Sequence, residues 1–435
     1  MTSVWRQTAD LPRFPSLEGD LKTEILIVGG GVAGLLCAYF LDREGADYAL
    51  VEAGRLCGGV TGNTTAKVTA QHGLLYRRLL RQFGLPKASL YLRANQEAVK
   101  RYRALCQELG CDFQEQDAFV YSTRDRNKIR EEVAALRKLG FPAEFTEKTP
   151  LPIPVAGAVR FPRQGQIHPL RFLGAAARGL RIYEETKVEE LAPGLAKTAR
   201  GTIRAKKILI ATHFPILNKH GGYFLKLYQS RSYVLALENA PELNGMYLDE
   251  DAKGLSFRNW EGRLLLGGGG HRTGKKGGGW EELSAFARKH WPQARETARW
   301  ATQDCMTLDG VPYIGAYSQG TEGLFVITGF NKWGMTSAMV GAMILTDRLL
   351  GRRNPYESVF DPSRSVLRGQ LAVNAAEAAL GLVTPTTPRC PHMGCALRYN
   401  AAEHSWDCPC HGSRFGEDGR LLDGPATGDL KKPPH

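Results

Sequence analysis

The sequence predicts an α/β protein with a second, mixed or antiparallel sheet and a small all-β domain at its C-terminus. Three observations lead to this prediction. An apolar strand, Ile25 to Val28, runs directly into a glycine-rich turn and a helical segment. The middle of the chain holds short strand-like runs bounded by glycine or polar turns. Cysteines and histidines gather after Pro388, behind a connector rich in proline and threonine.

Length and composition are those of a folded protein with ample core. The 435 residues exceed the usual size of one domain, so we expect two or three compact units. The net charge is +13, but the basic residues occur in short groups among acidic ones and no aromatic-interleaved basic motif accompanies them. We therefore expect no nucleic-acid binding, and a basic face that suits an acidic redox partner or an anionic substrate.

The sequence also bears on membranes and location. No run of about 20 apolar residues occurs, and the N-terminus lacks the charged start and apolar core of a secretory signal. We expect no membrane span and a cytoplasmic protein.

The N-terminal segment from Thr23 to Ala53 has the order strand, glycine turn, helix and second strand. Gly29 permits the tight turn, Gly31 lets the backbone approach a pyrophosphate at the helix N-terminus, and Gly34 allows the helix to lie close to the strand. Glu52 ends the second strand, where a carboxylate accepts hydrogen bonds from a ribose and disfavours a 2′-phosphate. The unit predicts dinucleotide binding, although this fingerprint alone does not separate FAD from NAD.

Three later stretches carry a family resemblance. They are "GGVTGNTTAKVTAQHG", "KKILIATHFP" and "GLFVITGFNKWGMTSAMVGAMILTDRLLG". Together with the N-terminal unit, they resemble the D-amino-acid-oxidase/glycine-oxidase superfamily of FAD-dependent oxidoreductases. The resemblance implies a Rossmann-like FAD-binding domain with an interleaved substrate domain, whose mixed or antiparallel sheet covers the flavin.

The candidate cofactor-binding residues extend beyond the glycine fingerprint. The amides at the start of the last helix, around Met335 and Thr336, could stabilise the negative charge of reduced flavin near N1 and C2=O. Besides Gly29, Gly31, Gly34 and Glu52, we expect FAD neighbours at Thr64, Thr65, Val188, Ala211, Gly329, Lys332, Gly334, Met335 and Thr336.

The predicted organisation places residues 1–362 in the oxidoreductase unit, 363–387 in a linker that begins with a short helix, and 388–435 in the C-terminal domain. Within the first unit, residues 86–109 and 125–139 are predicted helices.

One position bears on the substrate. In the resembled family, members that act on amino acids tend to carry an arginine five residues before the aspartate of a "T-x-D-G-x-P-x-I-G" stretch. Here that stretch is "TLDGVPYIG", and Asp304 stands five residues before Asp309. A carboxylate cannot clamp a carboxylate but can hold an ammonium group, which favours amines or polyamines of the glutamylputrescine type. The alternative is that Asp304 faces solvent or caps a turn.

The candidate catalytic residues are Lys332, Asp304, Arg258 and His271. Arg231, His72 and His168 are further polar candidates in presumed pocket-lining segments, and each has a structural or surface role as its alternative. Some relatives attach FAD through a cysteine. Cys305 does not match that position, so we expect non-covalent FAD.

The C-terminal cluster pairs Cys390-x-His392 with Cys408-x-x-His411. Two thiolates and two imidazoles at this spacing could bind zinc. However, the surrounding "CPHMGC" and "CPCHGS" closely resemble the two loops of a Rieske 2Fe-2S domain.

The Rieske resemblance implies roles for six residues. Cys390 and Cys408 would hold one iron, His392 and His411 the other, and Cys395 and Cys410 would form a disulfide between the loops. It also implies that the histidines face outward, toward an electron-transfer partner.

Two neighbours bear on the cluster's potential. Ser413 matches the residue whose hydroxyl donates to a bridging sulfide, whereas Phe415 replaces a hydrogen-bonding tyrosine of high-potential relatives. We expect a potential in the middle or lower part of a range from about −150 to +300 mV.

The combined prediction is an FAD-dependent oxidoreductase that oxidises an amine or amino-acid-like C–N bond. Electrons would pass through the Rieske cluster to an external one-electron carrier, possibly an acidic, ferredoxin-like one. One alternative is an electron-transfer protein or redox sensor without an amine substrate, and another is direct reaction of the flavin with oxygen. A Rieske oxygenase needs an iron site of two histidines and a carboxylate, and His213 and His220 lack a carboxylate nearby in sequence.

Overall fold

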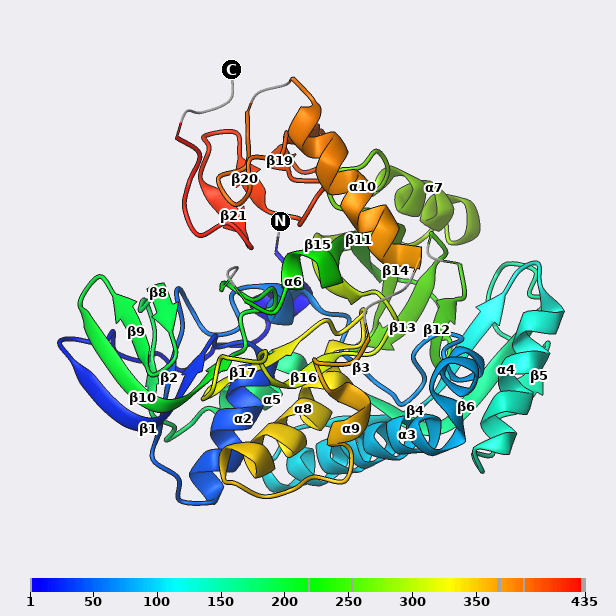
Figure 1. Cartoon of the computed structure of the whole chain (residues 1–435). Helices are drawn as coiled ribbons and strands as arrows, with labels where there is room; N and C mark the ends of the chain where they lie inside the picture. The colour runs from blue at the N-terminus through cyan, green and yellow to red at the C-terminus, as the bar shows by residue number, and fades with distance from the viewer. Residues whose placement is uncertain (1, 218–219, 252, 366–368, 386–387, 432–435) are drawn as a thin grey trace.

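The computed structural model describes residues 2–217, 220–251, 253–365, 369–385 and 388–431. Two large sheets and a small C-terminal sheet make up the molecule (Figure 1). This arrangement confirms the predicted fold class, an α/β domain with a mixed second sheet and an all-β C-terminal domain.

The first sheet has eight strands and holds the N-terminal nucleotide-binding unit. Strands β17, β10, β1, β2 and β7 are parallel neighbours, and β16 joins β17 antiparallel. The four residues at the end of β1, Ile25–Val28, are all buried, as a strand covered on both faces requires. The bounds are β1 Leu21–Val28, β2 Tyr48–Val51, β7 Ile182–Tyr183, β8 Val188–Ala192, β9 Leu195–Thr198, β10 Gly201–Ile210, β16 Tyr313–Ala316 and β17 Leu324–Thr328.

The second sheet has nine strands and is mostly antiparallel, with β12 parallel to β4. Its longest pairing joins β11 to β15. The bounds are β3 Lys67–Val68, β4 Phe113–Ser122, β5 Glu144–Thr146, β6 Gly157–Ile167, β11 Leu227–Glu238, β12 Met246–Asp249, β13 Ser256–Trp260, β14 Arg263–Arg272 and β15 Arg295–Thr307.

The helices pack mainly against the first sheet and around the second (Figure 1). The helix predicted at 86–109 forms the second part of α3. A shorter helix that begins at Tyr76 precedes it, and the two parts meet at a kink at Gly84 (φ 74°). Asp125 caps α4 by accepting a hydrogen bond from the Lys128 amide at 3.0 Å. The bounds are α1 Val4–Gln7, α2 Val32–Arg43, η1 Val60–Asn63, α3 Tyr76–Glu108, α4 Arg126–Lys138, α5 Pro169–Ala176, α6 Tyr223–Lys226, α7 Glu281–His290, α8 Gly334–Leu349, α9 Glu357–Phe360 and α10 Gly369–Val383.

The C-terminal domain is a four-stranded antiparallel sheet with α10 against it. Its strands are β18 Arg398–Asn400, β19 Ser405–Asp407, β20 Arg414–Gly416 and β21 Leu421–Asp423. Helix α10 fills most of the stretch predicted as a linker and contacts both parts of the chain. Its Asn374 donates to the carbonyl of Leu225 at 3.0 Å, and a Cβ at Gly381 would lie 2.5 Å from Cys410 Sγ.

The second cysteine–histidine loop of this domain is held by side chains of the second sheet. Gln229 Nε2 donates to the carbonyl of His411 at 3.1 Å, and Gln303 Nε2 donates to that of Gly412 at 2.9 Å. Arg272 Nε donates to the carbonyl of Pro409 at 3.0 Å. Gly412 is required here, because its φ is +89° and a Cβ would lie 2.6 Å from Gln229 Cβ.

A buried ion network also joins the two parts. Arg231 on β11 pairs with Glu403, which pairs in turn with Arg414 at 2.6 Å, and Arg414 contacts Asp407 at 3.0 Å. The Arg231 and Glu403 side chains are only 4% and 9% exposed. Removing one partner from such a buried pair costs about 3–5 kcal/mol, so the network fixes the docking. It also gives Arg231 a structural role in place of the expected pocket role.

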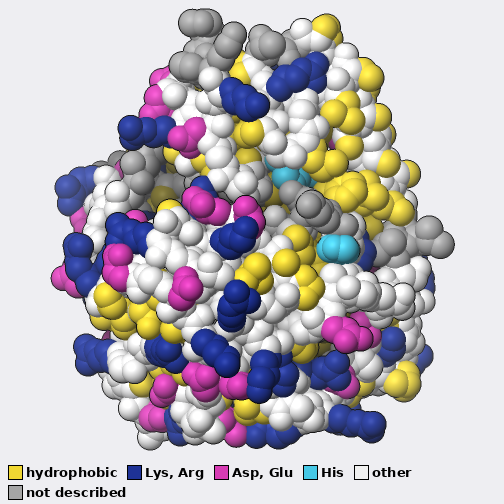
Figure 2. All heavy atoms as spheres, turned by 60° about the vertical axis from the view of Figure 1, so that its left-hand side comes forward, with side chains coloured by type: hydrophobic (Ala, Val, Ile, Leu, Met, Phe, Trp, Pro, Cys, Tyr) yellow, Lys and Arg dark blue, Asp and Glu magenta, His cyan; other side chains and the backbone are white. Residues whose placement is uncertain are grey.

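The surface shows the charge pattern that the sequence indicates. On the face in Figure 2, Lys and Arg side chains are interspersed with Asp and Glu rather than gathered into one large basic patch. Among the described residues, none of the helices combines the length and apolar character needed to cross a bilayer.

Candidate functional site

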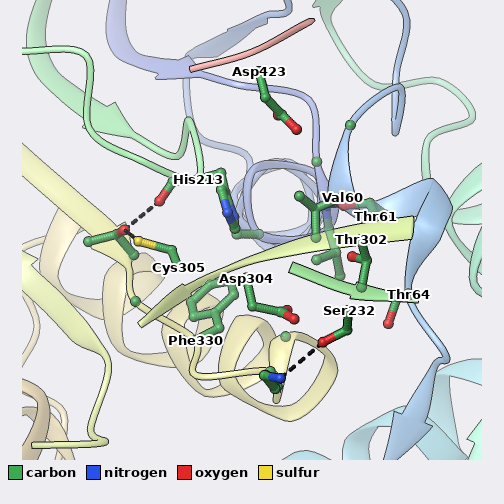
Figure 3. A pocket seen from close by; sticks show the side chains of 18 of the residues that line it. Val60, Thr61, Thr64, His213, Ser232, Thr302, Asp304, Cys305, Phe330 and Asp423 are labelled. Carbon is green, nitrogen blue, oxygen red and sulfur yellow. Dashed lines mark hydrogen bonds between the residues drawn. The ribbon is translucent and has the colours of Figure 1, made fainter. Parts of the chain in front are cut away.

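A cavity of about 620 Å³ lies where the two large sheets and the C-terminal domain meet (Figure 3). Its walls come from the β1–α2 turn, the segment after η1, strands β11 and β15, the β17–α8 turn, and the end of β21. Both the dinucleotide unit and the C-terminal domain therefore border the same space.

The glycine turn forms a cradle that side chains would fill. Gly29 has φ +113°, and a Cβ there would lie 2.6 Å from the Ala211 carbonyl oxygen. A Cβ on Gly34 would lie 1.9 Å from the Gly29 carbonyl oxygen, so helix α2 approaches β1 as closely as predicted. Gly31 precedes α2 without a side chain of its own to cap the helix, and the Val32 amide donates to Thr61 Oγ1 at 3.0 Å.

Glu52 lies on the cavity wall at the end of β2. Its carboxylate accepts hydrogen bonds from the Gly30 amide at 2.7 Å and the Gly54 amide at 2.9 Å. Burial raises the pKa of Glu52, and these amides oppose the shift. The position suits a ribose hydroxyl.

Most of the other predicted cofactor neighbours lie on the cavity wall. These are Thr64, Thr65, Val188, Ala211, Gly329, Lys332, Gly334 and Met335. Helix α8 starts at Gly334 without a side-chain cap, so its first amides are open to negative charge. Thr336 lies behind the wall and donates to the Thr69 carbonyl at 3.0 Å.

Asp304, Lys332 and Ser232 line the part of the cavity beside β11 and β15 (Figure 3). Lys332 Nζ donates to Ser232 Oγ at 3.0 Å. Burial raises the pKa of Asp304 and lowers the pKa of Lys332, and the attraction between the two groups opposes both shifts. Both groups are thus biased toward their neutral forms.

The four predicted cluster ligands converge within the C-terminal domain. The rings of His392 and His411 lie 4.9 Å apart, and Cys390 and Cys408 are buried in the same core cluster. In the part of the chain that the structure describes, the buried Nδ1 of His411 has no hydrogen-bond partner. Two thiols and two imidazoles gathered in this way fit a 2Fe-2S cluster with mixed ligands.

The residues around these ligands also lie close together. The sulfurs of Cys395, Cys408 and Cys410 are within 4.8 Å of one another. All the described cysteines are free thiols, so the Cys395–Cys410 disulfide stays a prediction. Ser413 hydrogen-bonds to the Cys390 thiol and accepts from the Ala426 amide at 3.0 Å.

Comparison with known proteins agrees with this geometry. The profile of the FAD-dependent oxidoreductases called DAO matches residues 24–348 of the 435. The chain belongs to this family. The profile of the Rieske [2Fe-2S] domain matches residues 363–434, a span that includes the predicted linker. The protein is therefore a DAO-family oxidoreductase with two cofactors, FAD and a Rieske cluster.

Individual relatives cover the whole chain or its FAD-binding part. The Bacillus subtilis protein YhfW, described as a Rieske 2Fe-2S iron-sulfur protein, is 34% identical over 99% of this chain and 97% of its own. Gamma-glutamylputrescine oxidoreductase of Escherichia coli is 23% identical over 79% of this chain and 88% of its own. Glycine oxidase from Geobacillus kaustophilus shares the fold, with a TM-score of 0.67, 21% identity, and coverage of 80% of this chain and all of its own.

The histidines of this DAO-family protein lie against its FAD-binding part, with His411 buried and His392 half-buried. The Phe214 ring lies 6.3 Å from the ring of His392 and 6.4 Å from that of His411. Phe224 of α6 lies 6.2 Å from His411, which is only 2% exposed. The expectation that the histidines point out toward an external partner is thus corrected: the FAD-binding part of the chain occupies that edge.

Arg258 and His271 do not line the cavity. Arg258 is fully buried, with its guanidinium 5.3 Å from the Trp5 ring and 5.1 Å from the Trp260 ring. His271 stacks on Tyr233, and its Nε2 lies 3.1 Å from the Tyr233 hydroxyl. Their predicted catalytic roles have no support in this geometry, because packing against aromatic rings engages both side chains.

The two other histidine candidates also have structural roles. His72 lies in the core, 2.6 Å from the Tyr91 hydroxyl, and burial lowers its pKa to about 3. His168 caps α5 by accepting a hydrogen bond from the Arg171 amide at 3.2 Å. Burial lowers the pKa of His168 to about 4.

The cavity residues that were not predicted include His213, Asp423 and Lys67. Burial lowers the pKa of His213, while Asp423 and Asp304 favour its charged form. Burial also lowers the pKa of Lys67 to about 7. Lys67 lies within the quoted "NTTAKVT" stretch, so the sequence contained a signal for it. Asp423 had none, because its place depends on how the two domains dock.

The Gly34→Ala variant should lose FAD. The added methyl group would overlap the Gly29 carbonyl, at a cost of about 3 kcal/mol or more, and push α2 away from the turn. We expect purified protein with little flavin absorbance per chain but a normal Rieske signal in EPR. In the matched Gly369→Ala variant, the new Cβ meets nothing within 4 Å. A Gly34→Ala protein with full flavin content would contradict the assignment.

Proposed function

We propose that this protein oxidises a small amine at FAD and passes the electrons through its own Rieske cluster to an external one-electron acceptor. The contact that carries the proposal is that of Phe214 with both His392 and His411. The residue before it, His213, lines the FAD cavity. Two adjacent residues therefore connect the cavity to the histidine edge of the cluster.

The two cofactors divide the chemistry. Bound FAD accepts a hydride, and the Rieske cluster carries single electrons. The position of His213 is held by a hydrogen bond, which its carbonyl accepts from Thr328 at the end of β17. Thr328 lies in turn beside Cys305, with 3.6 Å between Sγ and Oγ1, and both line the cavity.

Asp304 is the proposed base for the substrate amine. Hydride loss requires a neutral amine, and a carboxylate whose pKa is raised by burial can remove the proton of an ammonium group. Asp249 and Asp251 also line the cavity, which favours the entry of a cation. The similarity to gamma-glutamylputrescine oxidoreductase supports an amine with a short carbon chain.

The alternatives have less support. A Rieske oxygenase needs two histidines at a second iron, but among the described residues that line the cavity His213 is the one histidine. An electron-transfer protein or redox sensor would not require the acidic, desolvated group at Asp304. An acidic, ferredoxin-like acceptor, non-covalent FAD and a cytoplasmic location stay predictions.

An anaerobic titration of the purified protein with amines and amino acids tests the proposal. The expected result is flavin bleaching followed by the rhombic EPR signal of a reduced Rieske cluster, without an added reductase. Dithionite serves as the control that produces the cluster signal directly. If dithionite gives the signal and no amine or amino acid bleaches the flavin, the protein is an electron carrier and the proposal is wrong.

In the Asp304→Asn variant, the amine should reduce the flavin slowly at every pH. Loss of a general base lowers rates by about 10²-fold or more. In the wild type, the base must be deprotonated, so amine-dependent flavin reduction should fall as the pH drops through the raised pKa of Asp304. In the variant, the rate should not fall in this way at low pH. Stopped-flow bleaching as a function of pH measures both effects. If the rate in Asp304→Asn falls at low pH as it does in the wild type, a group other than Asp304 causes the fall.

The Phe214→Leu variant should separate the two redox steps. Flavin bleaching by amine should keep its rate, while cluster reduction should slow roughly tenfold because the contact between cavity and histidines is loosened. Rapid freeze-quench EPR measures the second step. Phe224→Leu is the matched control, since the Phe224 ring also packs against His411 but Phe224 does not border the cavity. Equal cluster-reduction rates in Phe214→Leu and wild type would argue for another path.

A further inference from the structure

The C-terminal domain carries the cluster and also forms part of the wall of the 620 Å³ cavity. The segment from Leu421 to Thr427 lies along one side, and Leu421, Asp423, Gly424, Ala426 and Thr427 line the cavity. This segment is held at Gly424 and at Ala426. Gln229 Nε2 donates to the Gly424 carbonyl at 3.0 Å, and the Ala426 amide donates to Ser413 Oγ at 3.0 Å.

Asp423 is the charged residue of this segment, and Figure 3 shows its carboxylate directed into the cavity. Its side chain is 29% exposed. Among the described residues, the one ion pair of Asp423 is a loose contact of 3.9 Å with Arg231, whose guanidinium is already paired with Glu403. No hydrogen bond within the described part of the chain ends on its carboxylate oxygens. A carboxylate placed in this way retains capacity for a cation.

Asp304 faces the same space from the opposite side, with His213 between the two carboxylates (Figure 3). Both acids favour the charged form of His213, while burial lowers the pKa of His213. The positive charge of Lys332 lowers the pKa of Asp304 and so opposes the effect of burial. Asp304 and Asp423 are thus two separate carboxylates of the cavity wall, one from each domain, in addition to Glu52 and the acidic residues 249–251.

We propose that Asp423 binds a second cationic group of the substrate, so that the preferred substrate carries amino groups at both ends of a short chain. Asp304 serves the amine that is oxidised, and Asp423 holds the distal ammonium group. This inference rests on the proposed amine oxidation at the same site. It makes the Rieske domain part of substrate recognition as well as electron transfer.

Binding to the oxidised holoenzyme under anaerobic conditions tests the inference, with 1,4-diaminobutane and butylamine as probes. Perturbation of the flavin spectrum, recorded before bleaching, gives each dissociation constant. In the wild type, we expect the diamine to bind roughly tenfold or more tightly than the monoamine, the scale of one hydrogen bond to a charged group. Asp423→Asn should remove this preference and leave butylamine binding unchanged, and Asp423→Glu should restore part of it.

Asp418→Asn is the matched control, because it changes an exposed carboxylate of the same domain away from the cavity. It should leave both affinities at the wild-type values. Equal affinities for the two probes in the wild type, or an unaltered diamine preference in Asp423→Asn, overturn the inference and leave the proposed amine oxidation in place. If neither probe nor any other amine binds or bleaches the flavin, the proposed function fails as well.

A second measurement uses only the wild type and so does not depend on the folding of a variant. Hydrogen exchange should show slower exchange of the amides of residues 421–427 when 1,4-diaminobutane is added, and no such change with butylamine. The same exchange in both cases would place the substrate away from Asp423 and overturn the inference. The Rieske EPR signal, recorded on each sample, verifies that the domain remains intact.

Discussion

The structure depends on the hydrogen bonds between the second sheet and the backbone of the second Rieske loop. Gln229, Gln303 and Arg272 donate to the carbonyls of His411, Gly412 and Pro409. These contacts fix the loop that carries His411, and so turn the histidine edge toward Phe214. Contacts between domains within a chain are by default loose enough to allow relative motion. Here a buried ion network around Glu403 adds a second constraint on the position of the C-terminal domain. Phe214 is therefore held beside the histidines of the cluster.

Burial also sets the chemistry of the cavity. Asp304 and Lys332 lie close enough to attract each other, yet desolvation shifts each pKa toward the neutral form. A carboxylate in this environment is a stronger base than one in water, which suits the removal of a proton from an ammonium group. In the proposed function, the aspartate at the position where amino-acid oxidases tend to have an arginine favours a cationic substrate and supplies a group for proton transfer.

Local features of the site could be predicted from the sequence, because each depends on residues close together in the chain. The turn at Gly29, the approach at Gly34 and the carboxylate of Glu52 belong to one strand–helix–strand unit. The loops around Cys390 and Cys408 are likewise short motifs. Features that depend on docking could not be predicted. Arg258 lies between Trp260 of its own strand and Trp5, which is far from it in sequence, and Asp423 reaches the cavity only because the C-terminal domain lies on β11 and β15.

The inward histidines change what an external partner must do. In the resembled Rieske domains, the histidine edge is the surface that a partner meets. In this chain, Phe214 and Phe224 cover it, and His411 is almost fully buried. In the proposed function, an external acceptor would approach the cluster from another face, because Phe214 and Phe224 pack against the histidines. Electrons would then flow from the cavity to the cluster and outward, because the part of the chain that binds FAD already contacts the cluster ligands.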